Sequence, residues 1–133
     1  MAVRSPTDWW PLFQRAMRAG DLEAVLRLYE PEVAFASTAG QVRSGQAELR
    51  QALAPLAEAK ADFAVATKKI IQTGDLALLQ TEWRITRPRP TSGYALEILR
   101  RQEDGNWLLV IGDPFTIGRR DAERELTDTS NTV

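Results

Sequence analysis

The dipeptide Asp104-Gly105 constrains the fold more than any other part of this chain. It separates two runs of strand-forming residues, 93–102 and 107–116. Asp-Gly is a strong hairpin signal because both residues tolerate the positive φ angles that a tight turn requires. The sequence therefore predicts an antiparallel hairpin whose second strand carries an acid, Asp113, near its end.

The rest of the chain predicts helices first and strands afterwards. Apolar residues recur at helical spacing from Thr7 to Tyr29, with an interruption at residues 19–21, and again after Gly45-Gln46. Runs 63–73 and 75–86 then read as two further strands with short connections. Short connections favour an antiparallel meander, so we expect an α+β domain.

Composition narrows the possible functions. The chain has 133 residues, which suits one domain at residues 1–118, followed by a charged and then polar tail at 119–133 that we expect to be frayed. With 17 basic and 18 acidic residues, it lacks the positive charge that nucleic-acid binding requires. No apolar run is long enough for a membrane span or a signal peptide, so we expect a cytoplasmic protein.

The chain contains no histidine and no cysteine. This excludes serine–histidine triads, thiolate nucleophiles and metal sites built on histidine or sulfur. We therefore expect neither a metal nor a cofactor.

The hairpin register predicts which side chains share a face of the sheet. A two-residue turn places Leu96 opposite Asp113 and Ile98 opposite Ile111. The face toward the helices would then hold one set of residues: Leu96, Ile98, Trp107, Leu109, Ile111, Asp113 and Phe115, with Ala77, Leu79, Thr81, Trp83 and Ile85 on the preceding strand. Glu97 would lie on the opposite face, which is mixed enough to be a dimer interface, whereas a four-residue loop would move Glu97 inward.

Several short motifs occur in a characteristic order. They are Gly20-Asp21 between two helical segments, Tyr29 to Phe35, Gly45-Gln46 at a helix start, Gly74-Asp75-Leu76-Ala77, Trp83, and Asp104-Gly105-Asn106-Trp107. In this order, over about residues 8 to 117, they resemble the nuclear transport factor two-like (NTF2-like) superfamily, in particular its ketosteroid isomerase-like and polyketide cyclase-like branches.

The resemblance implies a cone-shaped, strongly curved sheet that wraps over helices and encloses a pocket, usually in a homodimer. It does not imply a single activity. Steroid isomerases of this fold have a general-base aspartate after the first short strand, but here Phe35 is followed by Ala36-Ser37-Thr38. Those enzymes also use a tyrosine on the first helix, whereas Tyr29 is expected near the end of the second helical segment.

Two residues are candidates for chemistry. Asp113 would be desolvated on an apolar face, as a general acid or base requires, or it could instead start a turn before Pro114 and bind nearby backbone. Tyr29 could orient a carbonyl or phenol in the pocket, or it could be an ordinary core residue. Trp9 and Trp10 are adjacent on a helix, so we expect only one of them to face inward.

These observations predict a protein that binds a small, largely apolar organic molecule. As an enzyme it would be a cofactor-independent isomerase, cyclase or dehydratase, with Asp113 as acid or base and Tyr29 as hydrogen-bond donor. The pocket wall would be formed by a set of apolar side chains: Trp83, Leu96, Ile98, Trp107, Ile111 and Phe115. The alternative is a noncatalytic ligand-binding or dimerising association module, which a pocket filled by Trp83, Trp107 and Phe115 would favour.

Overall fold

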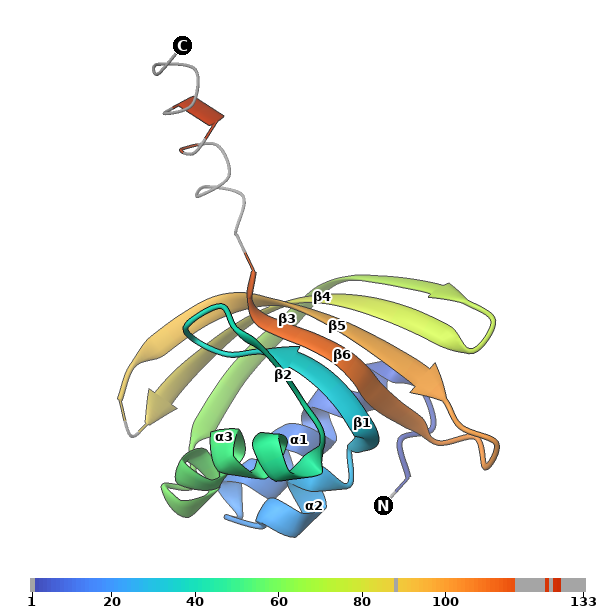
Figure 1. Cartoon of the computed structure of the whole chain (residues 1–133), viewed down its shortest axis with the longest axis horizontal. Coiled ribbons are helices and arrows are strands. Elements are labelled where there is room, and N and C mark those ends of the chain that lie inside the picture. The colour runs from blue at the N-terminus through green and yellow to red at the C-terminus, as the bar shows by residue number, and fades with distance from the viewer. Residues whose placement is uncertain (1, 88, 117–123, 125, 128–133) are drawn as a thin grey trace.

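A six-stranded sheet curves over three helices (Figure 1). The computed structural model describes residues 2–87, 89–116, 124, 126 and 127. Its elements follow in chain order: η1 (Pro6–Asp8), α1 (Trp9–Arg18), α2 (Leu22–Leu26), β1 (Tyr29–Ala36), β2 (Val42–Ser44), α3 (Gln46–Glu58), β3 (Asp62–Thr73), β4 (Leu76–Arg87), β5 (Thr91–Arg101) and β6 (Trp107–Thr116). The predicted α+β class is confirmed, and most of the tail expected at 119–133 lies outside the described residues.

The strand order is β2-β1-β6-β5-β4-β3, and every neighbouring pair is antiparallel except β1 and β6. The sheet is open, because β2 and β3 form its two edges. Helices α1, α2 and α3 cover one face, which we call the inner face, and the other is the outer face (Figure 1). None of the described helices is long and apolar enough to cross a membrane.

The two N-terminal helices separate where the sequence predicted. Gly20 has a φ of 72°, and the side chain of Asp21 accepts a hydrogen bond of 3.1 Å from the backbone of Ala24 at the start of α2. Tyr29 was expected near the end of this helix, and that expectation is wrong. Tyr29 begins β1, where it pairs with Leu109 of β6.

The core lies between the inner face and the helices. On β4 the predicted inward set is confirmed, because Ala77, Leu79, Thr81, Trp83 and Ile85 are all buried. Their partners on the helical side include Phe13, Met17, Val25, Leu49 and Ala57. This packing forms one continuous core in the described part of the chain.

The hairpin between β5 and β6 differs from the prediction in its turn. The backbone N–H of Gly105 donates to the carbonyl of Gln102 over 2.9 Å, and Gly105 has a φ of 86°. The turn therefore contains three residues with glycine in the left-handed position. Leu99 pairs with Leu109 whereas Ile98 pairs with Ile111, so Val110 is the extra residue of a β-bulge.

The turn and the bulge together restore the predicted pairs but change the face on which they lie. Leu96 is opposite Asp113 and Ile98 is opposite Ile111, as predicted. Because Leu99 and Leu109 point inward and side chains alternate along a strand, Ile98 and Leu96 point outward. The inward assignment of Leu96, Ile98 and Ile111 is thus wrong. Glu97 lies on the inner face, as the alternative placed it, although the turn has three residues and not four.

Candidate functional site

A cavity of about 530 Å³ lies between the inner face of the sheet and the helices. Eight of the ten aromatic residues of the chain line it: Trp9, Trp10, Phe13, Tyr29, Phe35, Phe63, Trp83 and Phe115. Apolar side chains of α3 close one side, among them Leu49, Leu53 and Leu56. The aromatic side chains surround this space rather than filling it.

Glu97 is the buried acid of this cavity. It lies on β5, is 3% exposed, and is one of the residues that line the space. Its Oε1 atom accepts hydrogen bonds from Nε1 of Trp10 at 2.7 Å and from Oγ1 of Thr81 at 2.9 Å. Its Oε2 atom is buried and has no hydrogen-bond partner among the described residues.

The surroundings of Glu97 favour its neutral form. Burial raises its pKa from 4.5 to about 7, although the hydrogen bonds from Trp10 and Thr81 act in the opposite direction. Desolvation is the larger effect because a carboxylate loses far more hydration than a carboxylic acid. Both donors bind Oε1, so the proton of the neutral acid has its free position on Oε2.

Trp10 reaches Glu97 because both adjacent tryptophans of α1 are buried. Trp9 is 1% exposed and Trp10 is 8% exposed, so the expectation that only one would face inward is wrong. Neighbouring side chains on a helix point about 100° apart, and the curved sheet covers both of these directions. Nε1 of Trp9 donates to the carbonyl of Leu28 at 2.9 Å, so each indole has its own acceptor.

Tyr29 lines the same cavity from the start of β1. Its ring meets Trp9 edge-on at 5.4 Å between ring centroids. Burial raises the pKa of Tyr29 above its ordinary value, and the nearby Glu97 carboxylate raises it further. The phenol therefore keeps its proton, and its hydroxyl makes no hydrogen bond to another described residue. It is a donor that a ligand could use.

Asp113 is among the residues that line the cavity, but it is only half-buried, and its partner Leu96 on β5 points to the outer face. Its Oδ1 atom accepts a hydrogen bond of 3.2 Å from the backbone of Phe115. This is the backbone contact that the turn interpretation predicted. Asp113 thus combines a place in the cavity wall with a local structural role.

The other predicted wall residues divide into two groups. Trp83 and Phe115 line the cavity, and their rings lie edge to face at 5.7 Å. Leu96, Ile98 and Ile111 do not line it, because they lie on the outer face, where Ile111 is 48% exposed. Trp107 does not line the cavity either. It is buried elsewhere, with the guanidinium of Arg101 5.6 Å from its ring centroid.

Trp83 is held in place by the neighbouring strands. Its Nε1 atom donates to the carbonyl of Pro114 at 2.7 Å. A Cβ atom at Gly93 would lie 2.9 Å from Cζ2 of Trp83 and 3.0 Å from that same carbonyl oxygen. Glycine at position 93 therefore allows the indole to cross β5 and reach its acceptor.

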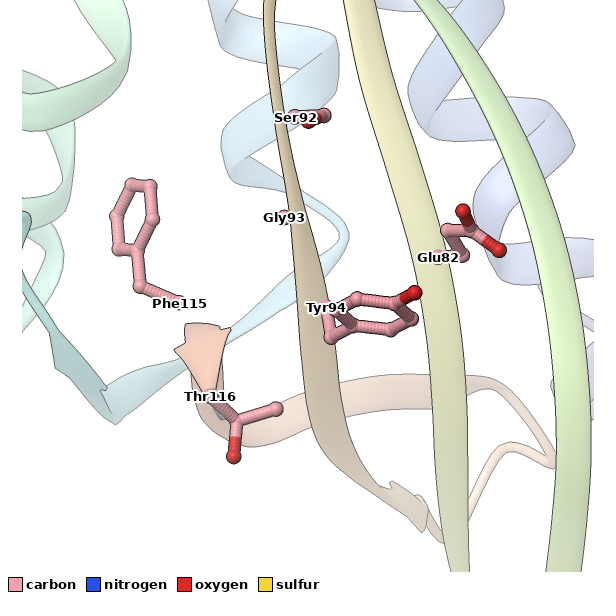
Figure 2. A pocket seen from close by; sticks show the side chains of 6 residues that line it. All are labelled: Glu82, Ser92, Gly93, Tyr94, Phe115 and Thr116. Carbon is pink, nitrogen blue, oxygen red and sulfur yellow. The ribbon is translucent and has the colours of Figure 1, made fainter. Parts of the chain in front are cut away.

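A second hollow of about 350 Å³ is lined by Glu82, Ser92, Gly93, Tyr94, Phe115 and Thr116 (Figure 2). Phe115 extends away from Tyr94 and Glu82 there. The charged residue of this hollow, Glu82, has a side chain that is 49% exposed, and it pairs with Lys68 at 3.6 Å. Since it contains no buried titratable group, the inner cavity is the stronger candidate site.

Sequence reasoning missed the link between Glu97 and Trp10. A signal was present: Glu97 alternates with Ala95 and Leu99, which are both buried. An acid in phase with buried apolar residues indicates either a mistaken register or a functional carboxyl group. Among the described residues, no group of three metal-ligating side chains is close enough to hold an ion.

The fold and the cavity define the class of protein. A curved, open sheet over N-terminal helices with a cavity between them is the architecture of the NTF2-like superfamily, and the chain has this fold. More specifically, residues 12–113 match the model of the SnoaL-like domain. The chain belongs to the SnoaL-like domain family.

Solved structures share the fold at low sequence identity. One is an NTF2-like protein of unknown function from Shewanella oneidensis MR-1, with a TM-score of 0.71 and 21% identity over 82% of this chain and 98% of that one. Another is a candidate dehydratase of the NTF2-like family from Streptomyces avermitilis, with a TM-score of 0.63 and 19% identity over 84% of this chain and 94% of that one. A third is a candidate ketosteroid isomerase from Shewanella frigidimarina NCIMB 400, with a TM-score of 0.64 and 17% identity over 80% and 90%. No curated protein matches the sequence.

Proposed function

We propose that the protein binds a small, largely apolar organic molecule in the inner cavity and that Glu97 is its main polar contact. The observation that carries this proposal is the free Oε2 atom of Glu97, which is buried without a partner in a space lined by aromatic rings. A buried polar atom without a partner costs free energy, and a ligand atom placed beside it would recover that cost. The aromatic walls supply the apolar contact area.

The chemistry that fits this site is proton transfer without a cofactor. With a pKa of about 7, Glu97 exists in both its acid and its base form near neutral pH. It can therefore take a proton from one position of a bound molecule and return it to another, as an isomerase, cyclase or dehydratase requires. The Tyr29 hydroxyl is a second donor for a substrate oxygen, and Asp113 is the second acid of the cavity.

The known relatives support this class of reaction without fixing it. One structural neighbour is a candidate dehydratase and another is a candidate ketosteroid isomerase, and both share the fold at below 20% identity. The alternative of a module that only associates was linked to a cavity filled by its own aromatic residues. The open space of about 530 Å³ favours ligand binding instead.

A thermal-shift screen tests the proposal. The panel contains steroids, polyketide-like aromatic compounds, terpenoids and epoxides, because a ligand that binds only the folded state raises the melting temperature. Glu97→Gln is the test variant, and Glu82→Gln on the outer face is its matched control. We expect a compound that stabilises the wild type and the control but loses most of its effect on Glu97→Gln. Equal stabilisation of all three proteins would remove Glu97 from the binding site.

We also propose a homodimer formed through the outer face. Ile71, Leu78, Ile98 and Ile111 are direct neighbours across four strands, so they form an apolar row on that face. Ile71 and Ile111 are exposed, and contiguous exposed apolar surface of this kind marks association sites. Light scattering during gel filtration should give the mass of a dimer for the wild type and of a monomer for Ile98→Lys. A monomeric wild type would contradict the dimer.

A further inference from the structure

We infer that the ligand carries a carboxylate, which Arg43 binds at the rim of the cavity while the opposite end of the ligand meets Glu97. This inference rests on the proposed function, since it concerns the ligand of the same cavity. It adds a chemical class: an apolar molecule with an acid group at one end and a hydrogen-bonding group, such as a ketone, at the other.

The two charged residues lie in one line across the sheet. Arg43 on β2 is opposite Phe35 on β1, Phe35 is opposite Gly112 on β6, and Gly112 is opposite Glu97 on β5. Directly opposite residues point to the same face of a sheet. Arg43 and Glu97 therefore both point to the inner face, and both line the cavity.

The spacing of the strands gives the distance between the backbones of Arg43 and Glu97. Three strand-to-strand steps of about 4.8 Å separate the backbones of Arg43 and Glu97, which amounts to about 14 Å. Gly112 lies between them without a side chain, and Phe35 is the aromatic wall beside it. The line therefore has polar ends, one acidic and one basic, and an apolar middle formed by Phe35 and Gly112.

Arg43 has hydrogen-bonding capacity to spare. Its side chain is 40% exposed, and it forms one salt bridge with a described residue, in which Nη1 lies 3.3 Å from Oε2 of Glu48. A guanidinium group has five N–H donors in a planar arrangement that matches a carboxylate. Its position at the end of the line leaves it open to solvent and to a ligand.

The other charged residues of the cavity also favour a ligand whose carboxylate faces Arg43. Arg43 is the one cationic side chain among the described residues that line the cavity, and the two acids are Glu97 and Asp113. A ligand carboxylate would be repelled by an ionised acid and attracted by the guanidinium. Asp113 already accepts a hydrogen bond from the backbone of Phe115. Arg43 is thus the favoured partner for an anion.

The test compares a keto acid with its uncharged ester. The probes are 5-benzoylpentanoate and its methyl ester, together with the homologous pairs that are two carbons shorter and longer. Calorimetry measures their binding to the wild type, to Arg43→Gln and to Arg50→Gln. Arg50 is the matched control, because it is 50% exposed, pairs with Glu23 at 2.7 Å, and does not line the cavity.

We expect at least one acid to bind the wild type about tenfold more tightly than its ester. Arg43→Gln should remove this preference by weakening the acid alone, whereas Arg50→Gln should retain it. The inference is overturned if no acid is preferred over its ester at any length, including the case in which neither binds, or if Arg43→Gln keeps the preference.

Failure of the Arg43 inference can be distinguished from failure of the proposed function. If the esters or neutral compounds of the screen bind in a manner that depends on Glu97, the cavity is a ligand site without an anion subsite. Only the loss of the dependence on Glu97 contradicts the proposed function itself.

Discussion

Replacing Glu97 by glutamine should change how the stability of the protein depends on pH. In the unfolded chain this carboxyl group has the ordinary pKa of 4.5, whereas burial raises the pKa of Glu97 in the folded protein to about 7. Between these two values the unfolded state binds fewer protons than the folded state. The free energy of unfolding therefore falls as the pH rises through this window, and it is constant with respect to Glu97 above it.

The size of the effect follows from the change in pKa. At about 1.4 kcal/mol per pKa unit, the rise from 4.5 to about 7 corresponds to about 3 kcal/mol. Glutamine does not titrate, and its side-chain oxygen can still accept the hydrogen bonds from Trp10 and Thr81. Relative to the wild type, Glu97→Gln should thus gain about 3 kcal/mol of stability between pH 4 and pH 8.

Urea unfolding followed by tryptophan fluorescence measures this difference. The curves are recorded at pH 4, 5, 6, 7 and 8 for the wild type, Glu97→Gln and the surface control Glu82→Gln. At each pH, the free energy of unfolding of the wild type is subtracted from that of the variant. This difference cancels the titration of all other groups. A difference that stays constant from pH 4 to pH 8, or that changes equally in Glu82→Gln, would refute the assignment of Glu97 as a buried acid with a raised pKa.

Three other substitutions have defined outcomes. Trp10→Phe removes a donor to Glu97, so it should lower stability by about 1 kcal/mol and move the pKa of Glu97 further upward, both visible in the same urea series. Gly93→Ala places a Cβ 2.9 Å from Trp83, so it should cost about 1–3 kcal/mol and alter tryptophan fluorescence, and an unchanged melting temperature would contradict the close fit. Asp113→Asn, assayed beside Glu97→Gln with any substrate from the screen, should retain most of the turnover that Glu97→Gln loses, and the reverse ranking would make Asp113 the acid.

The fold was predictable because its signals are local. The break at Gly20-Asp21, the strand lengths and the turn at Asp104-Gly105 each depend on a few neighbouring residues. The order of these motifs then identified the superfamily. Even the pairs Leu96–Asp113 and Ile98–Ile111 were predicted correctly.

The site was less predictable because it depends on long-range geometry. The three-residue turn brought Glu97 inward in place of Ile98, and the extra residue Val110 placed Ile111 on the outer face. The contact between Trp10 and Glu97 joins residues 87 positions apart, and no local pattern indicates such a bond. The burial of both Trp9 and Trp10 likewise depends on the curvature of the sheet, which the sequence of α1 does not encode.

A crystal structure of the protein with a compound from the screen would show directly whether Glu97 contacts the ligand. We expect the compound to lie in the inner cavity with a polar atom about 2.6–3.0 Å from Oε2 of Glu97. A compound that binds elsewhere, or that occupies the cavity and leaves this oxygen without a partner, would contradict the role proposed for Glu97.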